Sequence, residues 1–144
     1  MAPISLPTLS ATEELGARLA RLARPGDVIL LEGPLGAGKT ALARAFLRAA
    51  TGDPGLEVPS PSFTLVQTYE TGIGRVHHFD LWRLNGPERL TELGWDEARQ
   101  DIVLVEWPDR MGALRPAEAL TVALRYGQGE ARQAILTGWT ERLK

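Results

Sequence analysis

The chain has 144 residues, a formal net charge of −2 and no cysteine, and this length favours one domain, residues 1–144, around a single core. The lack of cysteine excludes a disulfide scaffold, thiolate-ligated zinc, an iron–sulfur cluster and a thiol nucleophile. A hydrophobic fraction of 44% and a charged fraction of 24% are ordinary for a globular protein. The slightly acidic balance provides no general attraction to nucleic acid or anionic lipid. Because we find no secretory signal and no apolar run of about 20 residues, we expect a cytoplasmic protein.

The first third of the chain predicts a helix, a strand and a second helix, in that order. Ser10 and Glu13 have the spacing of a capping box, and leucines at helical intervals follow until Pro25 ends the helix. Residues 28–31 form a short apolar run, which is typical of a strand buried on both faces. Residues 41–50 are rich in alanine and leucine and predict a helix that stops before a glycine.

The rest of the chain mixes strands with one further helix. Three prolines and two glycines make residues 52–61 a loop, residues 87–99 predict a helix, and residues 102–105 form a second fully apolar strand. Two hairpins are expected around glycine-containing turns: residues 63–69 with 75–81, and residues 120–126 with 131–137. We find no internal repeat or linker. The class is therefore α/β with a mixed sheet.

Residues 33–40 fit the pattern G-x-x-x-x-G-K-[ST] at every fixed position, between an apolar strand and a helix. Such a loop points several backbone N–H groups at a polyphosphate, and glycines allow the close approach. The lysine supplies charge for the β- and γ-phosphates, and the hydroxyl of the next residue is placed to ligate Mg²⁺. A plain strand-to-helix turn would explain the glycines but not the Lys-Thr pair. The candidate nucleotide-binding residues of the loop are Gly33, Leu35, Gly36, Ala37, Gly38, Lys39 and Thr40.

Two carboxylates follow predicted strands and are candidates for the metal shell or for orienting the attacking water. Glu106 ends the continuous apolar run 102–105, which suits a central parallel strand beside the phosphate-loop strand. Asp80 ends an alternating run, which suits an outer strand of the hairpin. Either residue could instead face solvent or cap the next element. Which of the two activates water stays open.

Four further features concern the nucleotide or the surroundings of its candidate site. No Asn-Lys-x-Asp sequence occurs, which disfavours a guanine pocket of the GTPase type and favours ATP. The segment 58–64 is either a switch that reaches the γ-phosphate or a proline-stiffened connection with capping serines. Trp82 and Trp107 stand beside the two carboxylates and could stack on a base or a partner, or close the rim of the core. His77 and His78 point to opposite faces of a strand, so we expect one in the core and one exposed.

Four motifs together resemble the bacterial TsaE family, also called YjeE, the ATPase of tRNA threonylcarbamoyladenosine synthesis. The resembling segments, in family order and spacing, are GPLGAGKT at 33–40, SPSFTLV at 60–66, HFDLWRL at 78–84 and LVEWP at 104–108. The resemblance implies a P-loop NTPase-like three-layer fold, with a mixed, mainly parallel central sheet plus antiparallel hairpins. This combination of motifs is far more specific than a phosphate loop alone.

The resemblance also implies a weak, Mg²⁺-dependent ATPase that acts with homologues of TsaB and TsaD, contacts tRNA only indirectly, and binds neither membrane nor DNA. Its implied residues are Lys39, Asp80 and Glu106 in catalysis, Thr40 and Glu106 on Mg²⁺, Trp107 beside the nucleotide, and Ser60, Ser62 and Thr64 in the switch.

The sequence departs from the family pattern at a few positions. Pro34 replaces an acidic residue, Ala41 a frequent threonine, Trp82 a tyrosine, and Ser62 a threonine whose hydroxyl it keeps. Two alternatives are weighed against the tRNA-modification ATPase: a small P-loop kinase that phosphorylates a metabolite, and a nucleotide-gated binding module with negligible turnover alone.

Overall fold

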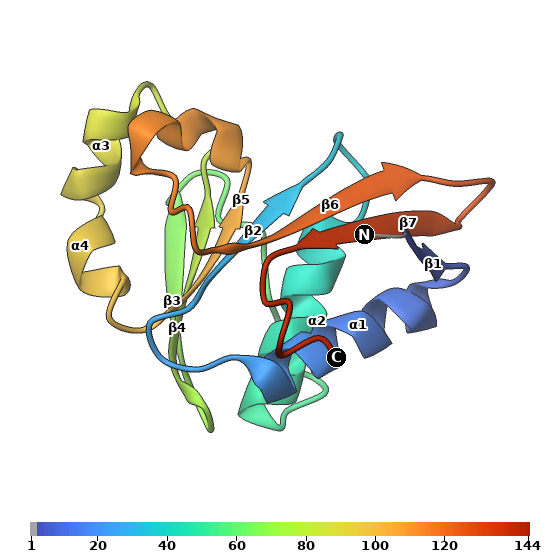
Figure 1. Ribbon diagram of the computed structural model, residues 1–144. Coiled ribbons are helices and arrows are strands. Elements are labelled where there is room, and N and C mark those ends of the chain that lie inside the picture. Colours follow the sequence, from blue (N-terminus) through green and yellow to red (C-terminus); the bar gives the residue numbers. More distant parts are fainter. Residues whose placement is uncertain (1–2) are drawn as a thin grey trace.

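Seven strands form one sheet in the order β1-β7-β6-β2-β5-β4-β3, in a computed structural model that describes residues 3–144 (Figure 1). The strands are β1 (Ile4–Leu6), β2 (Val28–Glu32), β3 (Val66–Thr71), β4 (Gly74–Asp80), β5 (Ile102–Glu106), β6 (Leu120–Tyr126) and β7 (Arg132–Thr137). The helices are α1 (Leu9–Leu22), α2 (Lys39–Thr51), α3 (Pro87–Glu92), α4 (Trp95–Ala98) and the 3₁₀ segment η1 (Pro108–Leu114).

The four central strands run parallel, and antiparallel strands flank them on both sides. Strand β2 pairs in parallel with both β5 and β6, and β5 pairs in parallel with β4. The ladders β3–β4, β6–β7 and β1–β7 are antiparallel. The predicted mixed sheet with two hairpins is therefore confirmed. Because β2 and β5 are covered by neighbours on both sides and both faces, they are the two continuous apolar runs of the sequence.

Helices cover both faces of the sheet, which gives three layers. Helices α1 and α2 lie against one face, where Ile29 and Leu31 of β2 join their core. The other face carries α3 and α4, and Val28 and Leu30 belong to that second core (Figure 1). This alternation follows from the two-residue period of a strand.

Helix α2 is fixed in place by a close contact with α1. A Cβ added at Gly16 would lie 2.7 Å from the Cβ of Ala45 and 3.0 Å from the carbonyl oxygen of Leu42. Only glycine lets the two helix axes approach this closely without a shift. Since α2 begins at the phosphate loop, this contact also helps to position the loop.

The predicted capping box at the start of the first helix is wrong. Thr8, not Ser10, has the extended backbone of an N-cap, and its hydroxyl accepts the N–H of Ala11 at 3.2 Å. Ser10 and Glu13 both lie inside the helix. Two hydroxyl-bearing residues stood near the helix start, and the capping-box spacing favoured the one that is not the cap.

The predicted helix 87–99 is two short helices. Gly94 has a φ of 84°, the left-handed conformation that ends α3 and begins α4. Trp95 and Ala98 of α4 are buried, and Leu90 of α3 is buried as well. The break lets both segments press their apolar residues onto one sheet face, which a single straight helix would not do.

Two strand predictions also need correction, and one strand was missed. Strand β3 begins at Val66 and not at residue 63, because Leu65 has a positive φ of 69°. The edge strand β1 was not predicted from its three residues. Strand β4, which carries Asp80, is not an outer strand: it lies between β5 and β3, and β3 forms the edge.

Candidate nucleotide-binding site

The loop between β2 and α2 is built on three glycines with positive φ. Gly33, Gly36 and Gly38 have φ values of 144°, 79° and 108°, which L-residues with a Cβ rarely adopt. At Gly33 there is also no room, because a Cβ would lie 2.7 Å from the carbonyl oxygen of Leu124 in β6. Gly38 is the N-cap of α2. The helix N-terminus, with its free N–H groups and positive dipole end, therefore opens onto the loop.

Lys39 folds back under this loop. Its side chain is almost fully buried, and Nζ donates to the carbonyl oxygens of Gly33 at 2.6 Å and Pro34 at 3.0 Å. The ammonium lies 3.9 Å from the centroid of the Trp107 ring. Burial lowers the pKa of Lys39, while the nearby carboxylates of Glu106, Asp80 and Asp109 act in the opposite direction. Lys39 is thus a partly desolvated cation at the start of α2, a form that attracts phosphate strongly.

A cavity of about 250 Å³ lies over Lys39, and we call it the phosphate cavity. The loop and α2 line one side of it, and the ends of β4 and β5 line the other. Its lining residues are Leu35, Gly36, Gly38, Lys39, Thr40, Ala41, Ser60, Ser62, Asp80, Trp82, Glu106 and Trp107. Residues from four separate segments therefore meet at the carboxyl ends of the parallel strands, the usual ligand position in such sheets.

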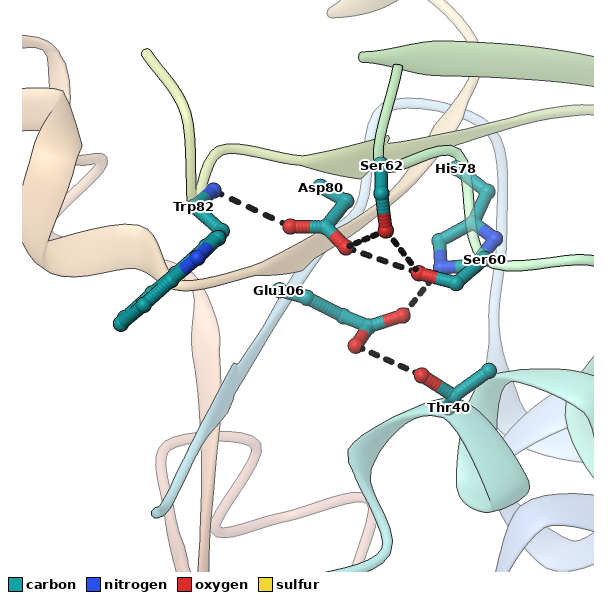
Figure 2. Close-up of polar contacts among 7 residues, drawn as sticks. All are labelled: Thr40, Ser60, Ser62, His78, Asp80, Trp82 and Glu106. Carbon is teal, nitrogen blue, oxygen red and sulfur yellow. Dashed lines mark hydrogen bonds and ion pairs between the residues drawn. The ribbon is translucent and has the colours of Figure 1, made fainter. Parts of the chain in front are cut away.

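The two candidate carboxylates are direct neighbours in the sheet. Asp80 and Glu106 pair with each other in the parallel ladder of β4 and β5. Both side chains are buried, at 4% and 2% exposure. Figure 2 shows Glu106 between Thr40 and His78: the Thr40 hydroxyl donates to Oε1 at 2.9 Å, and Nε2–H of His78 donates to Oε2 at 2.7 Å.

Asp80 connects the loop after α2 to this site. The Ser60 hydroxyl donates to its Oδ2 at 2.8 Å, and the Ser62 hydroxyl lies 3.5 Å from the same oxygen (Figure 2). Its Oδ1 accepts the backbone N–H of Trp82 at 3.0 Å. The carboxylate therefore has hydrogen-bond donors on both oxygens. Thr64 is not brought to the cavity and accepts instead from the side chain of Gln67 at 3.2 Å.

The other loop residues take different positions. Leu35 lines the cavity and is exposed, whereas Ala37 is buried beneath the loop, and its N–H donates to the carbonyl of Pro34 at 3.1 Å. Gly33 contributes its carbonyl to Lys39 but does not line the cavity. Pro34 lacks an N–H, yet its carbonyl accepts from both Ala37 and Lys39, so it stabilises the loop through its backbone.

Two tryptophans close the carboxylate end of the cavity. The rings of Trp82 and Trp107 lie 4.4 Å apart between centroids, at 47°. Trp107 has a φ of 59°, which bends the chain sharply after β5 and places its ring over Lys39. Trp82 is half exposed, and the Arg110 guanidinium lies 5.8 Å from its ring. This wall excludes water from one side of the lysine and the carboxylates.

Sequence reasoning missed that His78 belongs to the site. The residue is fully buried, as expected for one histidine of the pair, but it contacts the candidate carboxylate Glu106 and does not merely fill the core. Its neighbour His77 is only partly exposed and bonds to Asp101 at 2.8 Å. A signal was present: His78 stands two residues before Asp80, so the two side chains share a face of the strand.

A second missed feature is a clamp on the phosphate loop from the β6–β7 hairpin. The hydroxyl of Tyr126 donates to the carbonyl oxygen of Leu35, and Nη2 of Arg132 lies 3.4 Å from the carbonyl oxygen of Gly36. The guanidinium of Arg132 also lies 5.2 Å from the ring of Tyr126. More than ninety residues separate the partners in sequence, so no local pattern could reveal them.

A strand, a glycine-rich loop and a helix in this arrangement place the chain in the P-loop class of α/β proteins. Residues 6–134 match the family model described as threonylcarbamoyl adenosine biosynthesis protein TsaE. The chain belongs to the TsaE family. Among residues 3–144, no helix combines the length and the apolar character needed to cross a membrane.

Named proteins that are similar to this chain support its place in this family. The tRNA threonylcarbamoyladenosine biosynthesis protein TsaE of Rickettsia felis is 40% identical over 68% of this chain and 57% of its own length. The protein of the same name from a Nostoc species is 38% identical over 95% of this chain and 86% of its own. The crystal structure of YdiB from Bacillus subtilis aligns with a TM-score of 0.78 at 28% identity, covering 98% of this chain and 87% of that one. The chain thus spans little more than half of the Rickettsia protein but most of the other two.

Proposed function

We propose that this chain is an ATP-binding and ATP-hydrolysing component of the tRNA threonylcarbamoyladenosine machinery, acting in the cytoplasm with homologues of TsaB and TsaD. One observation carries the proposal: Lys39, Thr40, Asp80 and Glu106 surround a single cavity at the N-terminus of α2. Family membership supports the role in the tRNA threonylcarbamoyladenosine pathway. The four side chains support the binding and hydrolysis of ATP.

The residues of the phosphate cavity suit a magnesium–nucleotide complex. Mg²⁺ prefers hard oxygen ligands and in nucleotide sites takes one or two protein groups together with phosphate oxygens. The Thr40 hydroxyl and the Glu106 carboxylate are such a pair, 2.9 Å apart. When bound, the ion would neutralise charge on the β- and γ-phosphates. Lys39 would bind the same phosphates from below, since its ammonium is already held at the loop.

The two carboxylates have different surroundings, and this suggests a division of roles. Glu106 is held on both oxygens by Thr40 and His78, which suits a fixed metal ligand. Asp80 is bonded by Ser60 from the segment after α2, which suits the group that orients water and senses that segment. A ligand at the γ-phosphate position would compete for the Ser60 and Ser62 hydroxyls. The segment would then act as a nucleotide-dependent switch.

Weak ATP hydrolysis by the isolated chain fits the role of a switch within a larger assembly. No arginine among residues 3–144 lines the phosphate cavity, and P-loop hydrolases often rely on an arginine for transition-state charge. TsaB and TsaD homologues would raise turnover by ordering the switch or completing the site. The net charge of −2 is consistent with tRNA being held mainly by those partners.

The direct test compares the two lysines of the chain. Lys39→Ala should weaken Mg²⁺–ATP binding at least a hundredfold in calorimetry or Trp107 fluorescence, whereas Lys144→Ala should not change it. The Lys144 side chain is exposed and bonds to Glu141, 3.3 Å away, so it is a matched control. Unchanged affinity in Lys39→Ala would refute the phosphate-binding role.

A second experiment tests the pathway. Replacement of the chromosomal gene by the Lys39→Ala form should reduce threonylcarbamoyladenosine in tRNA, measured by nucleoside mass spectrometry. An undiminished level would refute the role in tRNA modification while leaving ATP binding intact. Transfer of the γ-phosphate to a metabolite in place of water would instead support a small kinase.

A further inference from the structure

The two oxygens of the Glu106 carboxylate lie in different surroundings. Oε1 accepts from the hydroxyl of Thr40 at 2.9 Å, and Thr40 lines the phosphate cavity. Oε2 accepts from Nε2–H of His78 at 2.7 Å (Figure 2). His78 is fully buried and does not line that cavity. Oε1 is therefore paired with a group of the cavity, whereas Oε2 is paired with a donor in the core.

His78 is held in position by the sheet. In the parallel ladder of β4 and β5 it pairs with Leu104, two residues before Glu106, so the imidazole and the carboxylate share one face of the sheet. Its Nδ1 is buried and has no hydrogen-bond partner among residues 3–144. Within this part of the chain, the one polar contact of the imidazole is therefore the contact to Glu106. A side chain that only filled the core would need no polar atom, so the contact indicates a role directed at the carboxylate.

The neighbouring carboxylate, Asp80, is restrained in a similar way. Its Oδ1 accepts the backbone N–H of Trp82 at 3.0 Å, and its Oδ2 accepts the Ser60 hydroxyl at 2.8 Å. The hydroxyls of Thr40 and Ser60 can turn their hydrogens away and offer oxygen to a cation, whereas the N–H groups of His78 and Trp82 can only donate. One oxygen of each carboxylate is therefore bound to an N–H group, which disfavours a bidentate contact of that carboxylate with a single cation.

This restraint distinguishes between two common divalent cations. Ca²⁺ takes roughly 6–8 oxygen ligands and binds carboxylates with one oxygen or with both. Mg²⁺ is smaller, requires nearly ideal octahedral geometry and usually keeps several waters, so it needs few oxygens from the protein. A carboxylate that offers a single oxygen in a fixed orientation therefore suits Mg²⁺ and removes a ligand that Ca²⁺ would otherwise use.

We propose that His78 is a positioning residue that makes the phosphate cavity selective for Mg²⁺ over Ca²⁺, because it holds Oε2 of Glu106 and leaves Oε1 for the ion. The inference rests on the proposed nucleotide-binding function and adds to it the group that determines the choice of cation. His78 acts through Glu106 and does not itself contact the ion.

The test measures the binding of three probes, Mg²⁺–ATP, Ca²⁺–ATP and ATP with EDTA, by calorimetry on the full chain. His78→Leu should weaken Mg²⁺–ATP binding by about tenfold, as expected for loss of a group that orients a metal ligand, and should not weaken binding of the other two probes. His78→Gln should retain the preference for Mg²⁺, because its amide N–H can replace Nε2–H as the donor.

The matched control is His77→Leu. His77 is the adjacent residue of the same strand, but it bonds to Asp101 and not to Glu106, so its replacement should leave the Mg²⁺-to-Ca²⁺ ratio of affinities unchanged. Thermal melting shows whether each variant is folded. If His78→Leu does not fold, His78→Asn takes its place, because its amide corresponds to the Nδ1 position and is too short to replace the donor at Nε2.

Each other outcome has a definite meaning. An equal loss of affinity for all three probes in His78→Leu would show that His78 only supports the fold, and it would overturn the inference. An unchanged ratio of Mg²⁺–ATP to Ca²⁺–ATP affinity in that variant, or a loss of the preference in His78→Gln as large as in His78→Leu, would overturn it too. So would equal binding of both complexes by the unmodified chain. Failure of the unmodified chain to bind ATP in any of the three forms would instead refute the proposed function.

Discussion

The buried contact between His78 and Glu106 leads to a quantitative prediction about stability. His78→Leu introduces an apolar side chain of similar size and removes the N–H that bonds to Oε2 of Glu106 at 2.7 Å. The carboxylate is 2% exposed, so water cannot easily replace the lost donor. Loss of a hydrogen bond to a buried charged group costs roughly 2–3 kcal/mol of unfolding free energy. At about 3–4 °C per kcal/mol, the melting temperature should fall by roughly 6–12 °C.

The same substitution should cost much less when Glu106 carries no charge. In a Glu106→Gln background, His78→Leu removes only a neutral hydrogen bond, worth about 1 kcal/mol. The double-mutant cycle, measured by urea denaturation, should therefore give a coupling free energy of at least about 1 kcal/mol. His77→Leu is the control, because His77 bonds to Asp101 and its cost should not depend on Glu106. An equal cost of His78→Leu in both backgrounds would show that His78 does not stabilise the Glu106 charge.

Three further predictions concern stability away from that contact. Gly16→Val should destabilise the fold by about 1–3 kcal/mol in urea denaturation, because even a Cβ at this position meets the Cβ of Ala45 at 2.7 Å; a neutral result would mean that α1 shifts freely. Arg142→Ala should cost about 1–3 kcal/mol, since it breaks the two bonds to Asp27, 2.6 and 2.9 Å long, in a partly buried pair; a change below about 0.5 kcal/mol would contradict this. Burial lowers the pKa of Lys39 from its ordinary value of 10.5, so the folded state releases this proton first. The stability of the unmodified chain relative to Lys39→Met should therefore rise with pH up to 10.5, and a difference that stays flat from pH 8 to 10.5 would argue against the shift.

The local structure of the β2–loop–α2 segment was predictable from the sequence. Gly33, Gly38 and Lys39 lie within seven positions, so their mutual geometry depends on one short stretch of backbone. The apolar run before them and the alanine-rich run after them fix a buried strand and a helix at either end. Glycine at positive φ and lysine beneath the loop both follow from the local chain path.

Element boundaries were less predictable, since they depend on single backbone conformations. Leucine normally avoids positive φ, but Leu65 adopts it, and β3 therefore begins only after this residue. Gly94 divides the segment 87–99, for which the sequence pattern predicted one continuous helix. Thr8 caps α1 although Ser10 had the better motif spacing. In each case packing of the neighbouring core decides between the competing local conformations.

The sequence by itself determined that this protein has a phosphate loop between a buried strand and a helix, with two carboxylates at strand ends. Only the tertiary structure decided that Asp80 and Glu106 are direct neighbours, that His78 holds Glu106, and that Arg132 reaches the loop from the far end of the chain. The reason is how far apart the contacting residues are in the sequence. A loop motif is encoded by adjacent residues, whereas contacts across 28 or 96 positions exist only once the strand order and register of the whole sheet are fixed.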